Sequence, residues 1–581
     1  MFAAPRAGTE PPPGGVAGVE PAAANENNGG AGDSTVLELR RGRHRAGQSA
    51  EPAAHPRRRW LSRAVLLLIL IMQAALTVRM HNTAFEDEGL YLYVGHLEIA
   101  HWLHGASLQG DYPAYFSGAP VLYPVLGALA DSVGGLAAAR ALSLTEMLAT
   151  TAVLYAITRR LFNERVGLCA AVIFSVAEPT LFLGNLATYD ASALCLLALA
   201  AWVAVRTAAF RRPVYLLAAP LVVLAVATKY AALLFVPGIV ALAGLAAWPR
   251  SGRRALIPPL ALGAAIGCLG AVALRVAGSD YWRGIEFTTL RRFQGNASVI
   301  TLLRDSAQWI GLPFALAVTG AVAYATRPST EPGEEVAPAG SRLRRALLGA
   351  VMVGSALLAP AEQIRIHTSV SLWKHVGFGL FYAAPIAGVG LARVVGDHFR
   401  RAQVGIAIWG AALVFGMTQA NSLFSAWPDS SVFVADMARY VRPGAHYLVE
   451  VDEVPIYYLR GHAGAQPDQF TSTYFIGYVD KQGRYLTGDA GYVAAIKAGY
   501  FHVVAFNYQT TPAVDAVIAR TLAADPDYRL ANVIPNGNDT VSQYIWVKTA
   551  TPAHPKTSKA KSRRKARASR RTRKTKARRR A

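Results

Sequence analysis

Three consecutive acidic residues, Glu86, Asp87 and Glu88, stand directly after the first long apolar stretch of the chain. Carboxylates at such a place suit general-base chemistry, in which a carboxylate takes a proton from an attacking hydroxyl group. A fourth acid, Asp190, begins a later apolar stretch, where an ionisable group is costly unless it faces protein or a water-filled cavity. The alternatives are a solvated loop for the three acids and a helix cap for Asp190.

Basic residues lie where the same apolar stretches end. Lys229 occupies a very short turn, and Arg291, Arg292, Arg365 and Lys374 lie in later turns. Cations at a membrane edge suit a phosphate or pyrophosphate headgroup. Their alternative role is to extend toward lipid phosphates, for which the tight turn at Lys229 leaves little room. Acids and cations together suit transfer at a lipid-linked phosphate, because the cations stabilise the leaving phosphate while a carboxylate deprotonates the acceptor.

The apolar stretches that position these residues predict an α-helical polytopic membrane protein. The chain has 581 residues, of which 53% are hydrophobic and only 16% are charged, against about 25% charged in soluble domains. A run of 18 or more apolar residues is typical of a membrane-spanning helix. We predict about eleven spans, at residues 60–80, 137–158, 166–184, 190–209, 214–228, 231–248, 255–277, 304–326, 346–361, 376–394 and 404–423.

The loops between the spans predict how the chain is oriented. Arginines gather in alternate loops, at residues 159–165, 211–212, 250–254, 342–345 and 400–401. Because Lys and Arg of short loops stay on the cytoplasmic side, we expect a cytoplasmic N-terminus in the cell membrane. The acidic loops and the chain after Leu423 are then extracytoplasmic.

The sequence divides into four regions: a disordered cytoplasmic segment (1–56), a transmembrane catalytic domain (57–425), a small extracytoplasmic α/β domain (426–550) and a disordered basic tail (551–581). The α/β domain is predicted from strands at 446–451, 501–506 and 542–548 and from helices near 432–441, 490–498 and 512–524.

The basic tail accounts for most of the net charge of +23, since residues 556–580 contain 15 Lys and Arg and no acid. Such a block is typical of an interaction arm. On the predicted topology it would meet anionic lipid or an acidic wall polymer. The tail has no aromatic residue for base stacking, which argues against specific nucleic-acid binding. The chain also lacks the GxxxxGK[ST], HExxH and strand–helix GxSxG patterns of soluble enzymes.

The ordered set of motifs resembles the protein O-mannosyltransferase and aminoarabinose transferase superfamily, membrane glycosyltransferases of the GT-C fold that use polyprenyl-phosphate sugars as donors. The similarity begins with Asp87-Glu88 and Tyr91, and its order covers about residues 60–425. It continues through Gly118-Ala-Pro-Val-Leu-Tyr-Pro124, Ala187-Thr-Tyr-Asp190, Thr228-Lys-Tyr230 and Ser371-Leu-Trp-Lys-His375.

The resemblance implies roles for particular residues. Asp87 is similar to the catalytic acid of the first loop, with Glu88 as its neighbour. Asp190 is similar to the acid that organises the site, and Lys229 to the lysine that contacts the carrier phosphate. From the topology alone we add Arg291 and Lys374 as lipid-phosphate ligands. Metal dependence stays open, since some GT-C enzymes place a divalent cation, here Mg²⁺ or Mn²⁺, between acids and phosphate.

The hypothesis is therefore inverting transfer of a hexose or pentose from a polyprenyl phosphate to a lipid, glycan or protein acceptor at the extracytoplasmic face. Two alternatives belong to other classes. A lipid or sugar transporter or flippase should carry its ionisable residues near the membrane midplane and show inverted repeats. A non-enzymatic scaffold for envelope assembly should tolerate Asn and Gln in place of the acids.

Overall fold

The computed structural model describes residues 56–549, apart from residues 109, 209, 211, 328–340 and 536–541, and gives only the backbone of residues 56–59. The predicted N-terminal segment (1–56) and the basic tail (551–581) therefore lie outside the described residues, except for the backbone of Pro56.

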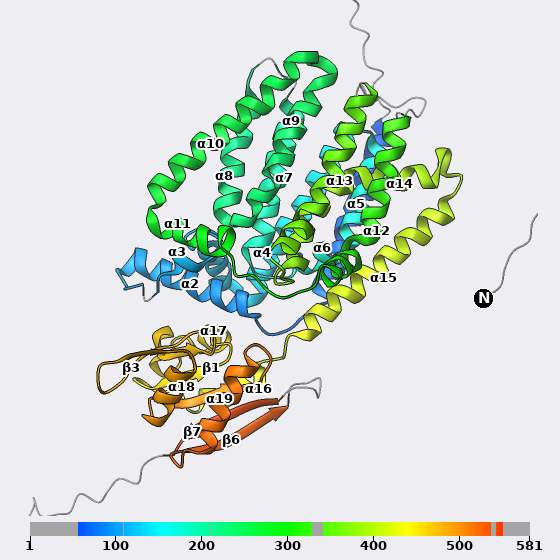
Figure 1. Cartoon of the computed structure of the whole chain (residues 1–581). Coiled ribbons are helices and arrows are strands. Elements are labelled where there is room, and N and C mark those ends of the chain that lie inside the picture. The colour runs from blue at the N-terminus through cyan, green and yellow to red at the C-terminus, as the bar shows by residue number, and fades with distance from the viewer. Residues whose placement is uncertain are drawn as a thin grey trace, which may run out of the picture. The chain divides into compact units, whose positions relative to one another are not determined.

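The described part of the chain between residues 56 and 426 is mostly helical (Figure 1). Its helices are α1 (Pro56–Val78), α2 (Glu86–His104), α3 (Tyr112–Tyr115), α4 (Tyr123–Leu161), α5 (Glu164–Val176), α6 (Glu178–Gly184), α7 (Tyr189–Thr207), α8 (Ala218–Thr228), α9 (Val236–Ser251), α10 (Ile257–Ala277), α11 (Ser279–Ile285), α12 (Val299–Thr326), α13 (Arg342–Arg365), α14 (Leu372–Val395) and α15 (Ala402–Ala426).

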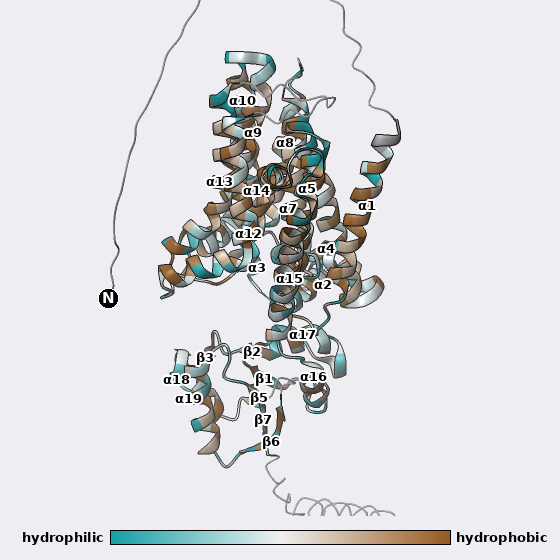
Figure 2. Cartoon of the chain, turned by 90° about the vertical axis from the view of Figure 1, so that its right-hand side faces the viewer, coloured by the Kyte–Doolittle hydropathy of each residue, from teal (hydrophilic) through white to brown (hydrophobic). Residues whose placement is uncertain are grey.

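Helix α14 forms the centre of this bundle. It packs against α5, α12 and α13, and 83% of its most apolar window is buried in protein. The corresponding windows of α1 and α15 are only 22% and 17% buried. Their outer faces remain apolar (Figure 2), as expected for helices whose surroundings are lipid.

The structure confirms a multi-pass membrane architecture but not the predicted number of spans. In the described residues, eight helical stretches are long and apolar enough to cross a membrane, or nine if the bent pair α5 and α6 forms one span. The chain bends by 66° between these two helices. Every predicted range overlaps at least one helix of the described residues. The count of about eleven stays a prediction.

Helix α4 contains a break in its helical geometry. Gly135 has φ 65°, a left-handed conformation that favours glycine, and it separates residues 123–133 from the long helical stretch after it. Helix α2 packs against α4. Gly95 of α2 makes this packing close, because a Cβ atom there would lie 1.9 Å from the carbonyl oxygen of Pro124.

The small C-terminal α/β region predicted from the sequence is confirmed. Its five-stranded sheet has the order β2-β1-β5-β7-β6, and β3 pairs with β4 in a separate hairpin. Strands β2, β1 and β5 are parallel, whereas β7 runs antiparallel to β5 and β6. The elements are α16 (Ser431–Ala438), β1 (His446–Val449), α17 (Glu453–Leu459), β2 (Phe470–Ser472), β3 (Gly477–Val479), β4 (Tyr485–Thr487), α18 (Gly488–Lys497), β5 (Phe501–Phe506), α19 (Pro512–Ala523), β6 (Tyr528–Pro535) and β7 (Ser542–Lys548).

The predicted strands and helices of this region correspond to β1, β5, β7, α16, α18 and α19. The sequence reading missed α17 and β2, which later prove to flank the site, as well as β3, β4 and β6. The three boundaries between the four predicted regions stay a prediction.

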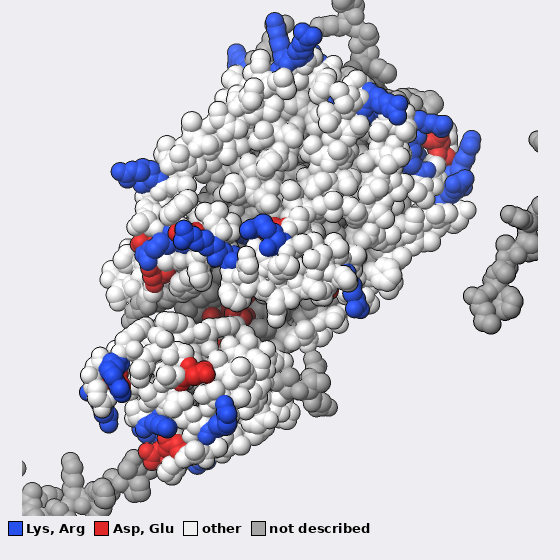
Figure 3. All heavy atoms as spheres, viewed as in Figure 1, with Lys and Arg blue, Asp and Glu red and all other residues white. Residues whose placement is uncertain are grey.

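Charged side chains gather near the ends of the helices, and the surface between them is almost free of charge (Figure 3). This distribution is typical of a protein that spans a bilayer. Which side of the membrane each end faces stays a prediction from the loop arginines.

Candidate active site

The three acids of the first loop lie in the first turn of α2. The partial positive charge of a helix N-terminus favours carboxylates there. Successive residues of a helix project about 100° apart, so consecutive side chains contact different surroundings. Glu86 faces the C-terminal domain, Asp87 faces α14 and Glu88 faces α4. The three consecutive acids therefore lie in three different environments.

Glu88 is fully buried and hydrogen-bonded on both oxygens. The guanidinium of Arg140 in α4 donates two bonds to it, at 2.8 and 2.7 Å. The backbone N–H groups of Phe85 (2.9 Å) and Ala187 (2.7 Å) donate two more. Arg140 donates in turn to the carbonyl of Asn82 at 2.9 Å. This arrangement makes Glu88 a residue that fixes the first loop, since its oxygens already have partners.

Asp87 forms an ion pair with Lys374 through its Oδ2 atom. The side chain of Lys374 is 7% exposed, whereas that of Asp87 is 36% exposed, so the carboxylate is open to an incoming group. The hydroxyl of Tyr91, one turn along α2, lies 3.4 Å from Oδ1 of Asp87. Burial and the adjacent charge of Asp87 raise the pKa of Tyr91, so its phenol keeps its proton.

Asp190 begins α7 and is completely buried. Its Oδ1 atom lies 2.6 Å from Nζ of Lys229, and its Oδ2 atom accepts a hydrogen bond from Thr188 at 2.9 Å. Nζ of Lys229 also lies 4.8 Å from the ring centre of Tyr189, a cation–π contact. The hydroxyl of Tyr189 lies 2.5 Å from that of Tyr91, which links the two ion pairs into one site.

The first-loop segment after α3 holds Lys229 in place. The backbone of residues 117–119 pairs with that of residues 227–230, through Ala119 N to Ala227 O and Tyr230 N to Ser117 O, both at 2.8 Å. A Cβ atom at Gly118 would lie 2.0 Å from the carbonyl oxygen of Thr228, so this approach requires glycine. The sequence segments around Gly118 and Lys229 thus meet as one structural unit.

The two neighbouring arginines have different surroundings. Arg291 is 80% exposed and its Nε lies 2.9 Å from Oε1 of Glu286. Arg292 is partly buried and donates to the carbonyl of Val370 at 3.4 Å. Its charge interacts with Asp87 and Tyr189, and burial is the main reason that the pKa of this guanidinium is lowered. Arg292, not Arg291, is therefore the arginine that faces the two ion pairs.

The structure thus brings Asp87, Asp190, Lys229 and Lys374 together, and it sets Glu88 and Arg291 apart from them. Sequence reasoning gave no role to Arg140 or Tyr189. A signal existed for Arg140, since it is the only cation within the predicted span 137–158. The close approach of Tyr189 to Tyr91 depends on packing between distant segments and has no local signature.

The described residues contain no group of three or more His, Cys, Asp or Glu side chains that could hold a metal ion. The two acids nearest the centre, Asp87 and Asp190, are each paired with a lysine. The side chains of this site therefore do not form the oxygen-rich cage that Mg²⁺ or Mn²⁺ prefers.

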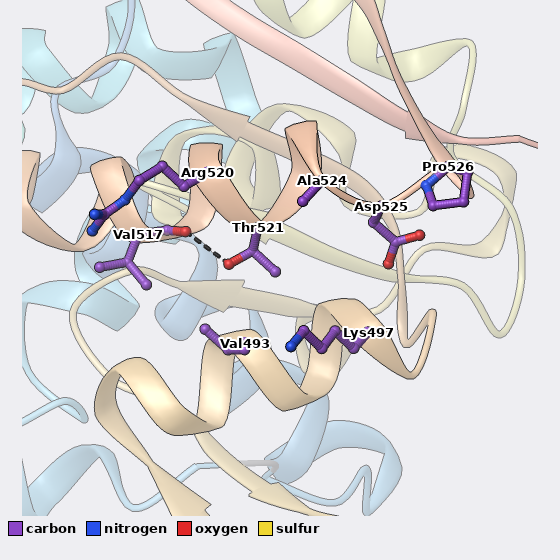
Figure 4. A pocket seen from close by; sticks show the side chains of 8 residues that line it. All are labelled: Val493, Lys497, Val517, Arg520, Thr521, Ala524, Asp525 and Pro526. Carbon is purple, nitrogen blue, oxygen red and sulfur yellow. Dashed lines mark hydrogen bonds between the residues drawn. The ribbon is translucent and has the colours of Figure 1, made fainter.

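A groove of about 530 Å³ lies away from these residues, between α18 and α19 of the C-terminal domain (Figure 4). Lys497 and Arg520 line it from the two helices, and the hydroxyl of Thr521 is engaged with the carbonyl of Val517 at 2.8 Å. None of the predicted site residues lines this groove.

Comparison with known proteins identifies the fold. Residues 121–275 match the family model described as dolichyl-phosphate-mannose-protein mannosyltransferase. The structure is similar to that of ArnT from Cupriavidus metallidurans bound to undecaprenyl phosphate, with a TM-score of 0.53 and 14% identity over 86% of this chain and 99% of that chain. The chain has the GT-C glycosyltransferase fold. The resemblance drawn from the sequence is confirmed.

A second GT-C structure is the oligosaccharyltransferase AglB from Archaeoglobus fulgidus in complex with an inhibitory peptide and a dolichol-phosphate. It aligns with a TM-score of 0.51 and 11% identity, over 85% of this chain and 74% of that chain. No curated protein matches the sequence. At this level of identity the GT-C likeness concerns the fold, and the chemistry has to be argued from the residues of this chain.

Proposed function

We propose that the chain transfers a sugar from a polyprenyl-phosphate carrier to an acceptor hydroxyl. The observation that carries this proposal is the meeting of two acids and three cations at one end of the central helices, around Asp87. The two similar structures contain undecaprenyl phosphate and dolichol-phosphate, which supports a lipid-phosphate donor. The arginine-rich loops support an extracytoplasmic location for this end of the helices.

The cations are suited to hold the carrier phosphate. Arg292 has no carboxylate within ion-pairing distance among the described residues, so its charge is available to an incoming anion. Lys374 breaks its ion pair with the partly exposed Asp87 and binds the phosphate instead. Lys229 stays bound to Asp190 and Tyr189, so it contributes its positive charge to the site without contacting the phosphate. Preorganised cations of this kind stabilise charge that develops on a leaving phosphate.

The proposed step is displacement at the anomeric carbon of the donor sugar. The acceptor oxygen forms a bond to that carbon as the bond between the carbon and the phosphate oxygen breaks. The electron pair of the broken bond stays on the carrier phosphate, where the cations stabilise it. The acceptor proton passes to Asp87, which Lys374 has released. Tyr91 and Tyr189 orient the carboxylate. We assign the transferred group to the hexosyl or pentosyl class.

The test is sugar transfer by the purified protein from a panel of radiolabelled polyprenyl-phosphate sugars, with wild type beside Asp87→Asn. Removal of a general base lowers rates by about 10²- to 10⁴-fold, so we expect the variant to lose turnover while it still binds undecaprenyl phosphate. Asp111→Asn is the matched control, because Asp111 is a half-exposed acid of the same loop region that pairs with Arg283.

Wild-type turnover together with full activity in Asp87→Asn would remove Asp87 from its assigned role. The absence of turnover with every donor, in folded protein supplied with a crude membrane extract as acceptor, would overturn the proposed reaction.

A further inference from the structure

Three carboxyl groups lie near enough to one another, on the side of Asp87 that faces the C-terminal domain, for their charges to interact. They are Glu86 in α2 and Asp452 and Glu453 at the start of α17. The hydroxyl of Tyr474 donates to Oε1 of Glu86 at 3.0 Å. Among the described residues, no lysine, arginine or histidine lies within ion-pairing distance of these three acids. The cluster is thus adjacent to the proposed base but has no cation of its own.

One oxygen of this cluster accepts no hydrogen bond from an N–H or hydroxyl group. It is the buried Oε2 of Glu453, whose carboxyl group has the carboxyl group of Asp452 as its hydrogen-bonding neighbour. A buried oxygen without such a hydrogen bond is costly, so it is expected to receive one from a molecule that the protein binds. The backbone at Glu453 packs closely against α2, because a Cβ atom at Gly89 would lie 2.8 Å from the carbonyl oxygen of Glu453. This contact fixes the position of Glu453 beside α2.

The cluster lies at the carboxyl edge of the parallel strands. Strand β1 lies between β2 and β5, so the chain leaves β1 on one side and returns to the sheet on the other. Such a topological switch point is where α/β sheets bind ligands. The side chain of Glu450 fills the crevice itself, where it accepts backbone N–H bonds from Asn507, Thr510 and Thr511. The residues that follow Glu450 and β2 therefore extend from a rigid edge toward α2.

Two tyrosines, Tyr474 and Tyr115, lie beside the acids. Tyr474 is 47% exposed and the adjacent Phe475 is 65% exposed. Tyr115, which is 42% exposed, lies close enough to Asp452 and Glu453 to interact with their charge. A binding site commonly combines apolar and aromatic faces with a few fixed polar groups. These residues provide both.

The protonation of the acids favours hydroxyl groups. Burial raises the pKa of all three carboxyls, that of Glu86 to about 7 and that of Asp452 to about 6, so near neutral pH the cluster is partly protonated. A protonated carboxyl donates one hydrogen bond and accepts others, as a hydroxyl does. An acceptor with several hydroxyl groups is complementary to this mixture, whereas an anionic acceptor would be repelled.

We propose that Glu86, Asp452, Glu453 and Tyr474 form the acceptor subsite, and that the acceptor is the uncharged sugar end of a glycan. The inference rests on the proposed function, which it deepens by naming the acceptor class. A sugar presents several hydroxyl groups within one residue and can satisfy several carboxyls together. A serine or threonine side chain presents only one hydroxyl. The reacting hydroxyl would reach Asp87, whose charge acts on Glu86 and which therefore borders this subsite.

Direct binding separates this inference from the proposed reaction. The full chain in lipid nanodiscs, without sugar detergents, is examined by saturation-transfer NMR against four probes: neutral methyl glycosides, a methyl aminoglycoside, a methyl glucuronide and a short Ser/Thr peptide. We expect binding of neutral glycosides to be stronger than that of the other probes and to weaken about tenfold in Glu453→Ala and Asp452→Ala, which remove the hydrogen-bonding groups. Asp468→Ala, in the same domain, is the control.

Binding only of the charged probes or of the peptide, or of none of the four, would overturn the acceptor class. Tyr474→Phe removes a single hydroxyl and so keeps the test valid if the acid variants do not fold. Unchanged glycoside affinity in Tyr474→Phe and in every acid variant that folds would overturn the subsite.

Transfer assays then complete the separation. In variants that turn over, we expect the KM for a glycoside acceptor to rise about tenfold while affinity for undecaprenyl phosphate is unchanged. Glycoside binding without any donor turnover would retain the subsite and reject the proposed reaction. Turnover with the same acceptor KM in wild type, in Tyr474→Phe and in every acid variant that folds would retain the reaction and reject the subsite.

Discussion

The two lysine–carboxylate pairs of the site differ in how far water reaches them. The side chains of Asp190 and Lys229 are 0% and 4% exposed, and the pair is enclosed by Thr188 and the ring of Tyr189. In the other pair, Lys374 is 7% exposed but Asp87 is 36% exposed. We call Asp190–Lys229 the sealed pair, because both side chains are buried, and Asp87–Lys374 the open pair, because water reaches its carboxylate.

The difference has consequences for what each pair can do. Separating a sealed pair leaves a charge in a medium that solvates it poorly, so such a pair stays together. An open pair loses less when a phosphate replaces the carboxylate, because water and substrate can compensate. On the proposed function, Asp190–Lys229 fixes the site and Asp87–Lys374 exchanges partners during the reaction.

The largest effect that tests this contrast is on stability. Asp190→Asn removes one member of the sealed pair and should lower the free energy of unfolding by about 3–5 kcal/mol, because Lys229 keeps an uncompensated buried charge. Asp87→Asn should cost about 1–2 kcal/mol, since the carboxylate is partly hydrated already. Thermal unfolding of both variants in the same detergent measures the difference.

A double variant provides the control. Asp190→Asn combined with Lys229→Met removes both charges and should recover much of the lost stability, without recovering transfer. Equal losses in the two single variants would contradict the distinction between a sealed and an open pair.

A smaller effect concerns the cation that approaches the open pair. Arg292→Gln should raise the KM for a polyprenyl-phosphate sugar by about 10- to 100-fold, because a charge-assisted hydrogen bond to phosphate is lost. Arg291→Gln is a matched control with the same exchange at the next position, and its KM should not change, since Arg291 is 80% exposed and paired with Glu286. Steady-state kinetics with saturating acceptor decide between them, and a larger effect at Arg291 would reverse the assignment.

The sequence predicted this architecture where the signal is local. Apolar stretches fix the helices, and the strands β1, β5 and β7 follow from alternating or continuous apolar residues. The acids at the start of α2 and α7 were recognised because an ionisable group at a span end is unusual. These features depend on neighbours in the chain, so they can be read from it.

What the sequence did not predict depends on contacts between distant segments. The role of Glu88 follows from Arg140, which is 52 positions away, and the choice between Arg291 and Arg292 follows from side-chain direction after a short π-helical turn. Strand β2 has only three residues, too few to show a period. Asp452 and Glu453 gain their significance only when α17 packs on α2.

The smallest predicted effect is a pH dependence beside the open pair. Burial, followed by the charge of Asp87, raises the pKa of Glu86 from 4.5 to about 7. Between these values the folded protein holds a proton that the unfolded chain releases, so the free energy of unfolding should fall as pH rises from about 4.5 to about 7.

Glu86→Gln removes this titration and should flatten the fall, by an amount on the order of 1 kcal/mol. Asp452, whose pKa burial raises to about 6, contributes in the same direction, so Asp452→Asn should flatten the lower part of the same range. Thermal midpoints at pH 5 and pH 7.5 for wild type and both variants measure the slope. If the thermal midpoint falls between pH 5 and pH 7.5 as steeply in both variants as in wild type, these carboxyls are ionised in the folded protein. The open pair would then lie beside hydrated, charged acids and not beside protonated ones.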